Sequence, residues 1–306
     1  MHRIEIPEKR IVKEFPSEVS EMREDQFIFF IGLVLQYLAG SITLGDFKIS
    51  LTMKLLDVKL NFGFAFMATE ERENARGEIF RISELCDSFF EEIIQDGEKV
   101  RTFKLNFTKN MIPEIWGRYY GPSDALIDIT FCEYRIAHSY YAAYLESNNE
   151  DDLNHLIAVL YRPAKPWLWL RKLLSSFDGQ VRVPFTSKYN PLHLEARVKE
   201  IAKLPMAVRY GIFLFFSGCE QFLAKGSVKV DGKEIDFSII YQKEDDAEDS
   251  PDIGLVGILY SLSETKVFGS IEQTDNQNLY DIMIRLFQVI KQARAMEQKY
   301  NSHDPG

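Results

Sequence analysis

TFCEYRIAHSYYAAYL (residues 130–145) and NEDDLNHLIAVLYRP (residues 149–163) are the two stretches of sequence that decide the fold class. In the first, Thr130 and Glu133 have the spacing of a capping box. The threonine hydroxyl would accept from the third helical amide while the glutamate reaches back to the cap. We therefore expect a helix to about Leu145. The second stretch predicts a helix over residues 149–160 that is ended by Pro163.

Apolar residues at helical spacing, together with start and stop signals, extend this pattern along the chain. They predict helical segments at residues 24–38, 44–56, 70–94, 167–177, 190–203, 205–226, 253–262 and 276–300. Strands are expected at residues 100–107 and in a hairpin near residues 228–240, built on the Asp231-Gly232 pair. Two short strands are possible between Val58 and Met67. The fold class that follows is mainly α, an α+β chain with minor antiparallel β hairpins.

A turn-rich joint suggests an irregular two-domain arrangement of many helices. Two prolines and two glycines fall close together there: Pro113, Gly117, Gly121 and Pro122. We expect a helical N-terminal domain with a short β element over residues 1–110. The main domain, residues 111–306, would hold the hairpin and an acidic loop at residues 243–252.

The composition of the chain is that of a folded protein with a buried core. Of 306 residues, 46% are apolar, enough to bury a core, and the charge is 36 − 46 = −10. Three widely spaced cysteines argue against a disulfide framework and fit a reducing cytosol. The first ten residues, MHRIEIPEKR, are polar and lack the apolar stretch that is typical of a signal peptide. The longest apolar run, residues 27–39, would extend roughly 20 Å as a helix, short of the roughly 30 Å bilayer core. A cytoplasmic protein without a membrane partner is therefore expected.

Candidates for catalysis are few. Asp124, Asp128, Glu133 and His138 are residue types that bind divalent metals, but they do not share one predicted helix face. Cys132 is a weak candidate nucleophile, because Glu133 beside it would raise its pKa. The chain has no glycine-rich phosphate loop, HExxH, GxSxG or CxxC motif. We expect no enzymatic activity, no cofactor and no metal.

Positive charge is concentrated between Ile157 and Arg209. Ten basic residues oppose three acidic ones there, so this segment carries +7 and the remainder −10 − 7 = −17. Aromatic side chains lie among the basic ones, a composition that holds single-stranded nucleic acid. The alternative is neutralisation by the chain's own acidic segments. Because the total charge is so negative, nucleic acid is the less favoured partner and a protein is preferred.

Six residues of this segment are candidates for partner binding: Tyr161, Arg162, Trp167, Trp169, Arg171 and Lys172. Tyr161, Arg162 and Pro163 would form the edge of the apolar stripe of the preceding helix. Arg162 would cap helix carbonyls or grip a carboxylate. In the simpler interpretation, it is only a structural arginine at a helix end.

The last predicted helix has a coiled-coil-like apolar seam, with steps of three and four residues. Its members are Leu279, Ile282, Leu286, Val289, Ala293, Met296 and Tyr300. This helix would either join two copies of the chain as a homo-oligomer or close its own domain. Phe287 and Ile290 widen the stripe, which favours the second interpretation.

The order of three motifs resembles a known group. A YGP turn at residues 120–122 precedes the TFxEY helix start at Thr130–Tyr134 and the LIAxLYRP helix at residues 156–163. The pattern is similar to that of a group of uncharacterised proteins encoded in phage and prophage structural-gene regions. The chain departs from that group at residues 18–20, where many members carry a tryptophan.

The resemblance implies a helical, non-enzymatic protein of virion assembly or structure, with tail assembly as the preferred role. Its partners would be phage structural or assembly proteins. It would work in the host cytoplasm or remain associated with the virion. The alternative function is that of a nucleic-acid-binding accessory protein that uses residues 157–209.

Overall fold

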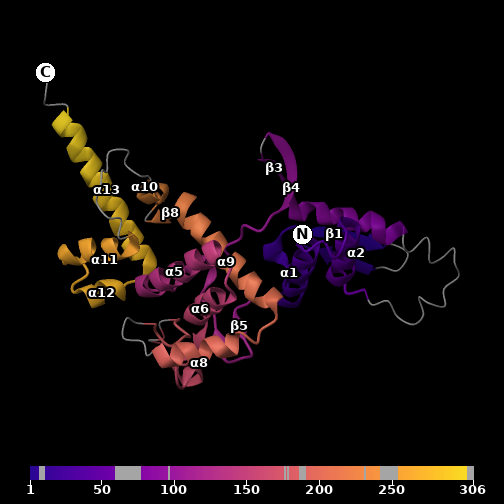
Figure 1. Ribbon diagram of the computed structural model, residues 1–306, viewed down its shortest axis with the longest axis horizontal. Helices are drawn as coiled ribbons and strands as arrows, with labels where there is room; N and C mark the ends of the chain where they lie inside the picture. The colour runs from indigo at the N-terminus through magenta and orange to yellow at the C-terminus, as the bar shows by residue number, and fades with distance from the viewer. Residues whose placement is uncertain are drawn as a thin grey trace. The chain divides into compact units, whose positions relative to one another are not determined.

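The computed structural model describes residues 1–6, 11–58, 77–95, 97–175, 177, 179–185, 191–230, 232–241 and 254–301. The fold is mainly α, with small antiparallel sheets of two or three strands (Figure 1). Two compact units form. Unit 1 comprises residues 1–107 and 205–214, and unit 2 comprises residues 108–204 and 215–306. The boundary between residues 107 and 108 lies close to the joint expected near residue 110. No feature of the sequence predicted that residues 205–214 belong to unit 1.

Unit 1 combines helices with two hairpins. Its strands β1 (His2–Ile6) and β2 (Ile11–Phe15) pair, as do β3 (Phe90–Gln95) and β4 (Glu98–Phe103). Its helices include α1 (Glu24–Leu38) and α2 (Leu44–Leu55), and 3-10 turns form at η2 (Val19–Glu21) and η3 (Glu84–Phe89). Phenylalanine rings from these elements form the core, among them Phe27, Phe30, Phe47, Phe89 and Phe103.

The predicted helix at residues 70–94 is wrong in its second half. Residues 77–83 are helical, but the chain then forms η3 and enters β3. Antiparallel pairing with β4 places the ring centroids of Phe90 and Phe103 4.7 Å apart, and both side chains are buried. The pairing partner, β4, lies outside residues 70–94, whose apolar spacing predicted a helix. Strand formation here therefore depends on contacts that the local pattern does not contain. Residues 59–76, which include most of the two possible strands, lie outside the described part.

Unit 2 is built around paired helices. α5 (Phe131–Ser147) packs against α6 (Glu150–Leu160), which also packs against α8 (Pro191–Ile201). One face of α6 is fully buried, including Leu153, Leu156 and Leu160. A three-stranded sheet, β5 (Glu114–Ile115), β6 (Tyr119–Tyr120) and β7 (Arg162–Pro163), follows the order of the chain.

Shorter elements and the terminal helices complete unit 2. They are η4 (Asp124–Leu126), α7 (Leu168–Arg171), the hairpin β8 (Ser227–Val230) and β9 (Lys233–Asp236), α10 (Ser238–Tyr241), α11 (Gly254–Glu264), α12 (Ile271–Asp275) and α13 (Leu279–Asn301). Helix α9 (Met206–Lys225) contributes residues to both units.

Most helix predictions are confirmed. The expected helices correspond to α1, α2, α5, α6, α8, α9, α11 and α13, with ends shifted by at most a few residues. The hairpin is also confirmed, and Gly232 takes the positive φ of 77° that its turn requires. The predicted helix at residues 167–177 is reduced to α7, while α10 and α12 were not predicted. The acidic loop, residues 243–252, lies outside the described residues.

None of the described helices combines the length and hydrophobicity needed to cross a membrane.

Candidate functional site

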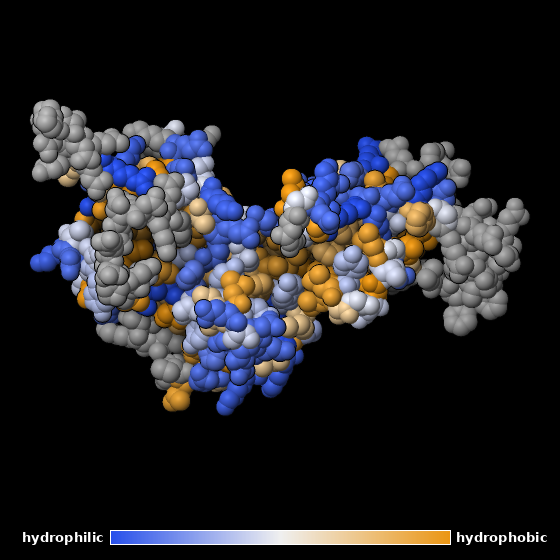
Figure 2. Space-filling model, turned by 45° about the horizontal axis from the view of Figure 1, so that its top comes forward, coloured by the Kyte–Doolittle hydropathy of each residue, from blue (hydrophilic) through white to orange (hydrophobic). Residues whose placement is uncertain are grey.

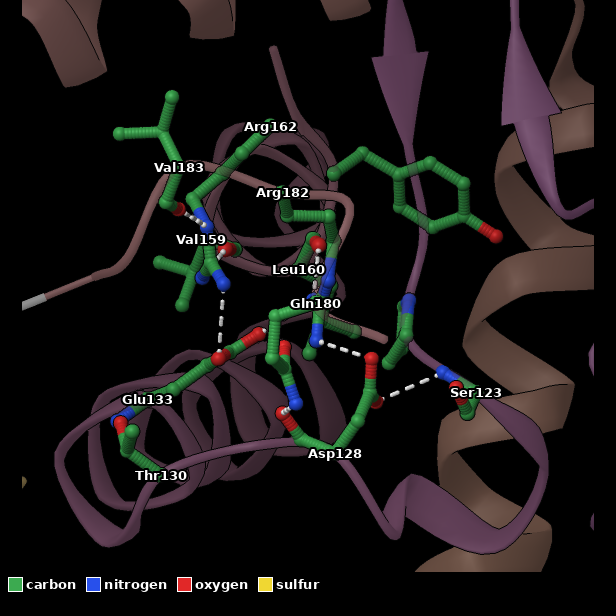
Figure 3. A network of polar contacts seen from close by, with 12 residues as sticks. Ser123, Asp128, Thr130, Glu133, Val159, Leu160, Arg162, Gln180, Arg182 and Val183 are labelled. Atoms are coloured by element: carbon green, nitrogen blue, oxygen red, sulfur yellow. Dashed lines mark hydrogen bonds and ion pairs between the residues drawn. The ribbon is translucent and has the colours of Figure 1, made fainter. Parts of the chain in front are cut away.

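A buried network of charged side chains lies where α5, the end of α6, β7 and the segment at residues 180–183 meet (Figure 3). Thr130 caps α5 as predicted, since its hydroxyl accepts from the Glu133 amide at 3.2 Å. The second half of the predicted capping box is wrong, because the Glu133 carboxylate turns inward. It accepts from Arg162 Nη2 at 2.9 Å and from Arg182 Nη1 at 2.6 Å.

Both arginines also satisfy backbone carbonyls. Arg162 donates from Nη1 to the Val159 carbonyl at 2.9 Å and from Nε to the Val183 carbonyl at 2.7 Å. Arg182 donates from Nη1 to the Leu160 carbonyl at 2.8 Å. The contacts with Val159 and Leu160 supply partners for carbonyls at the end of α6 that have none within the helix. The network is therefore a helix cap and a clamp between segments.

Aspartate and amide groups extend the network on the side of Arg182. Asp128 Oδ2 lies 3.1 Å from Arg182 Nη2, and Asp128 Oδ1 accepts from the Ser123 amide at 2.7 Å. Gln180 donates to the Asp128 carbonyl at 3.2 Å. Two guanidinium groups thus face two carboxylates. Burial lowers the pKa of Arg162, while the Glu133 carboxylate opposes that shift. A depression of about 360 Å³ borders the network.

Tyr161, next to Arg162, is also buried, and it contacts Asn110, Ile112 and Gly121. Its hydroxyl is close to Asn110 Oδ1 at 3.1 Å and donates to the Ile112 carbonyl at 2.6 Å. Gly121 approaches the tyrosine ring so closely that a Cβ there would lie 2.6 Å from Cζ. The YGP turn and the LYRP helix end therefore contact one another, which gives these two motifs a packing role.

These positions correct the sequence prediction for two candidates. Tyr161 is 0% exposed and Arg162 is 3% exposed, so neither offers a surface to a partner in this structure. The simpler interpretation of Arg162, a structural arginine at a helix end, describes its contacts. The network partner Arg182 was missed. It lies in an irregular stretch, and its only signal was its membership of the basic segment.

The other four candidates lie at the surface on or beside α7. Trp167, Trp169, Arg171 and Lys172 are all exposed. Leu170, Leu173 and Leu174, which sequence reasoning did not single out, are exposed as well. Hydrophobic residues reach the surface in groups among hydrophilic ones on the face drawn in Figure 2. Among the described residues, this run holds the densest group in sequence of exposed large apolar side chains.

The basic segment is less basic at the surface than its sequence predicts. Four of its ten basic residues are buried: Arg162, Arg182, Arg197 and Arg209. Arg197, for example, donates to the Tyr161 carbonyl at 3.3 Å. The net charge of +7 over residues 157–209 is therefore not all displayed at the surface, because these four arginines lie in the interior of the fold.

The metal and nucleophile candidates each have a different environment. Asp124 accepts from the Asn110 amide at 2.8 Å, and His138 Nδ1 lies 3.1 Å from Glu220 Oε2. Asp128 and Glu133 face arginines. Within the described ranges, no group of three or more His, Cys, Asp or Glu side chains is arranged to hold a metal ion. Burial raises the pKa of Cys132 to about 12, which opposes a thiolate role.

No protein-family model, no curated protein and no solved structure matches this chain. The fold and the two groups of side chains define a mainly α, two-unit protein with a buried charged clamp and an exposed apolar and cationic surface. The resemblance to phage-encoded proteins stays a prediction.

Proposed function

We propose that this protein is a non-enzymatic assembly or structural protein of a phage or prophage that acts through protein–protein contacts. Tail assembly is the step we favour. The protein would act in the host cytoplasm and either leave or remain with the virion. The phage assignment has its support in the order of the YGP, TFxEY and LIAxLYRP motifs at residues 120–163.

The observation that carries a role in protein contacts is the surface around α7, here called the α7 surface. It consists of Trp167, Trp169, Leu170, Arg171, Lys172, Leu173 and Leu174. Its five large apolar side chains are between 42% and 76% exposed. Tryptophan and arginine are residue types that dominate the energetics of protein interfaces. Apolar side chains exposed together typically mark interaction sites, because burying them releases water from apolar surface.

The buried clamp supports a structural role for the LYRP motif. Its arginines are engaged by Glu133, Asp128 and backbone carbonyls. Such groups hold a scaffold in one shape and offer no spare acid or base for a substrate. A fixed shape is what an assembly protein needs to present a surface such as α7.

The nucleic-acid alternative rests on the same two tryptophans beside Arg171 and Lys172. Bases stack on aromatic rings, and cations bind phosphates. Three exposed leucines on the α7 surface have no role in that mode of binding, and four arginines of the basic segment are buried. The composition of the exposed side chains therefore favours a protein partner over a single strand.

Gene deletion tests the proposal. The gene is deleted in frame from the prophage expected to carry it, and the particles made after induction are counted and imaged. We expect infectious particles to fall at least tenfold, with incomplete particles in the lysate. The wild-type chain and Trp116→Ala should restore the yield, whereas Trp167→Ala/Trp169→Ala should not. A gene outside any phage region, or normal particles after deletion, would refute the proposal.

A further inference from the structure

The backbone of the α7 surface is fixed in a way that turns a large ring outward. Trp167 has φ of 58°, a conformation that L residues rarely adopt, and its side chain is 70% exposed. Its carbonyl accepts from the amides of Leu170 and Arg171, each at 3.0 Å. Arg171 Nε also donates to the Pro166 carbonyl at 3.2 Å. These contacts hold the turn that presents the indole to solvent.

The stretch of sequence that contains these apolar side chains carries charge of one sign. Residues 161–177 contain no aspartate or glutamate. Arg171 and Lys172 are exposed and form no ion pair with a described carboxylate. Elsewhere, exposed arginines of this acidic chain have such partners: Arg118 lies 3.1 Å from Glu200, and Arg81 lies 2.9 Å from Glu78. Within the described part of the chain, no carboxylate therefore competes with an external anion for Arg171 and Lys172.

Resting on the proposed function, we infer that the α7 surface binds an acidic amphipathic helix of a partner protein. Its apolar stripe would cover Trp167, Trp169 and the leucines, and carboxylates at its edges would pair with Arg171 and Lys172. Helix-in-groove and helix-on-patch recognition combines these two features. Charge complementarity selects the sign of the partner, because a basic helix would leave the cations opposed by like charge.

Two other occupants fit less well. An anionic lipid surface would also take tryptophan, leucine and cations, but it would repel the rest of a chain whose net charge is −10. A nucleic acid strand would meet the same repulsion and would leave three leucines uncovered. The leucines favour a protein helix over a nucleic acid strand. A short acidic helix confined to the α7 surface meets less of this repulsion than an extended anionic surface does.

Direct binding to defined probes tests this inference with the full chain. The probe is a helical peptide of about 18 residues with leucine on one face and glutamate on the other. Its matched control has lysine in place of every glutamate. Phosphatidylglycerol vesicles and oligothymidylate of about 20 nucleotides are the remaining arms. We expect the acidic peptide to bind at least tenfold more tightly than the basic one, and its affinity to fall as salt increases.

Substitutions assign the binding to the α7 surface. Trp167→Ala/Trp169→Ala should weaken binding of the acidic peptide at least tenfold. Trp116→Ala, which removes an exposed tryptophan from the β5–β6 turn, should change it less than twofold. Arg171→Glu/Lys172→Glu should reverse the preference, so that the basic peptide binds better. All of these side chains are exposed, and unchanged circular dichroism would confirm that each variant folds.

Equal binding of both peptides, no binding of either, or tighter binding of the vesicles or oligothymidylate would overturn the inference. So would loss of binding in Trp116→Ala as large as in the double variant. These results leave the phage deletion experiment unaffected, since that experiment asks whether the chain is needed for particles. Normal particles after deletion would refute the assembly role even if the acidic peptide bound.

Discussion

Arg182 donates from Nη1 to Glu133 Oε1 over 2.6 Å, although the two residues are 49 positions apart. The same carboxylate accepts from Arg162 Nη2 at 2.9 Å, and the side chains of all three residues are at most 3% exposed. Removing ions from water is costly, so a buried set of this kind is stable only when every member keeps its partners. Glu133 is the member that both arginines share.

Glu133→Gln should therefore destabilise unit 2 by about 3–5 kcal/mol, because it leaves two buried guanidinium groups short of negative charge. All three tryptophans, Trp116, Trp167 and Trp169, belong to unit 2, so tryptophan fluorescence during urea unfolding reports on this unit. Glu195→Gln is the control. Glu195 is 55% exposed beside His155, and its loss should cost less than about 1 kcal/mol. Equal shifts for the two variants would contradict the clamp.

The hydrogen-bond geometry of Arg162 can be tested separately from its positive charge. Arg162→Lys keeps one positive charge but cannot reproduce three donors directed at the Val183 carbonyl, the Val159 carbonyl and Glu133. We expect the free energy of unfolding to decrease in the order wild type, Arg162→Lys, Arg162→Ala, as measured by urea unfolding. A lysine variant as stable as the wild type would show that charge alone matters.

Local signals predicted the helices well, because caps, prolines and apolar spacing act over a few residues. Thr130 and the 149–160 helix are examples. The inward direction of the Glu133 carboxylate could not be predicted from such local signals. Its sequence neighbourhood fits a capping box, but two arginines from distant segments compete for the carboxylate and bind it more strongly. The β3 strand was missed for a similar reason, since β4 supplies its pairing.

The candidate site was predictable only in part. The run WLWLRKLL at residues 167–174 marks the α7 surface in the sequence itself. Which of its neighbours face solvent is set by tertiary packing. Tyr161 and Arg162 lie close by in sequence, yet contacts with Asn110 and Glu133 bury them. Sequence proximity therefore grouped buried and exposed residues into one predicted binding set.

Gly121→Ala should destabilise unit 2 by about 1–3 kcal/mol, because the new methyl group would overlap the Tyr161 ring and lie 2.7 Å from Asn110 Nδ2. The measurement is thermal unfolding followed by circular dichroism. Gly45→Ala in α2 serves as the control. Its nearest neighbour would be 3.7 Å away, so alanine should be neutral or stabilising there. A harmless Gly121→Ala would mean that the tyrosine can move aside.

His138 should make the stability of unit 2 depend on pH. Its hydrogen bond with Glu220 raises the pKa of His138 above its ordinary value of 6.5. The stabilisation is complete below the unfolded pKa of 6.5 and is lost as pH rises through the higher folded pKa. The effect should stay below about 1 kcal/mol, because the His138 side chain is 39% exposed.

Glu220→Gln removes the carboxylate that causes this dependence while keeping the contact with Tyr134 possible. Urea unfolding across about pH 6 to 8.5 should show a smaller decline in stability for this variant than for the wild type. An identical decline in both proteins would assign the pH dependence to other groups.

The three cysteines allow the two units to be followed independently. Cys86 lies in unit 1, whereas Cys132 and Cys219 lie in unit 2, and all three are fully buried. Burial raises the pKa of Cys86 to about 11 and that of Cys132 to about 12, and it raises the pKa of Cys219 too. Since the thiolate is the reactive form, iodoacetamide at about pH 8 should leave the native thiols unmodified.

Mass spectrometry after labelling in increasing urea would then locate each unfolding event. Cys132 and Cys219 should become reactive together, because one cooperative unit holds both. In Glu133→Gln, that transition should move to lower urea while the transition of Cys86 stays in place. Labelling of Cys132 without urea, or an equal shift at Cys86, would show that the buried clamp does not stabilise unit 2 in particular.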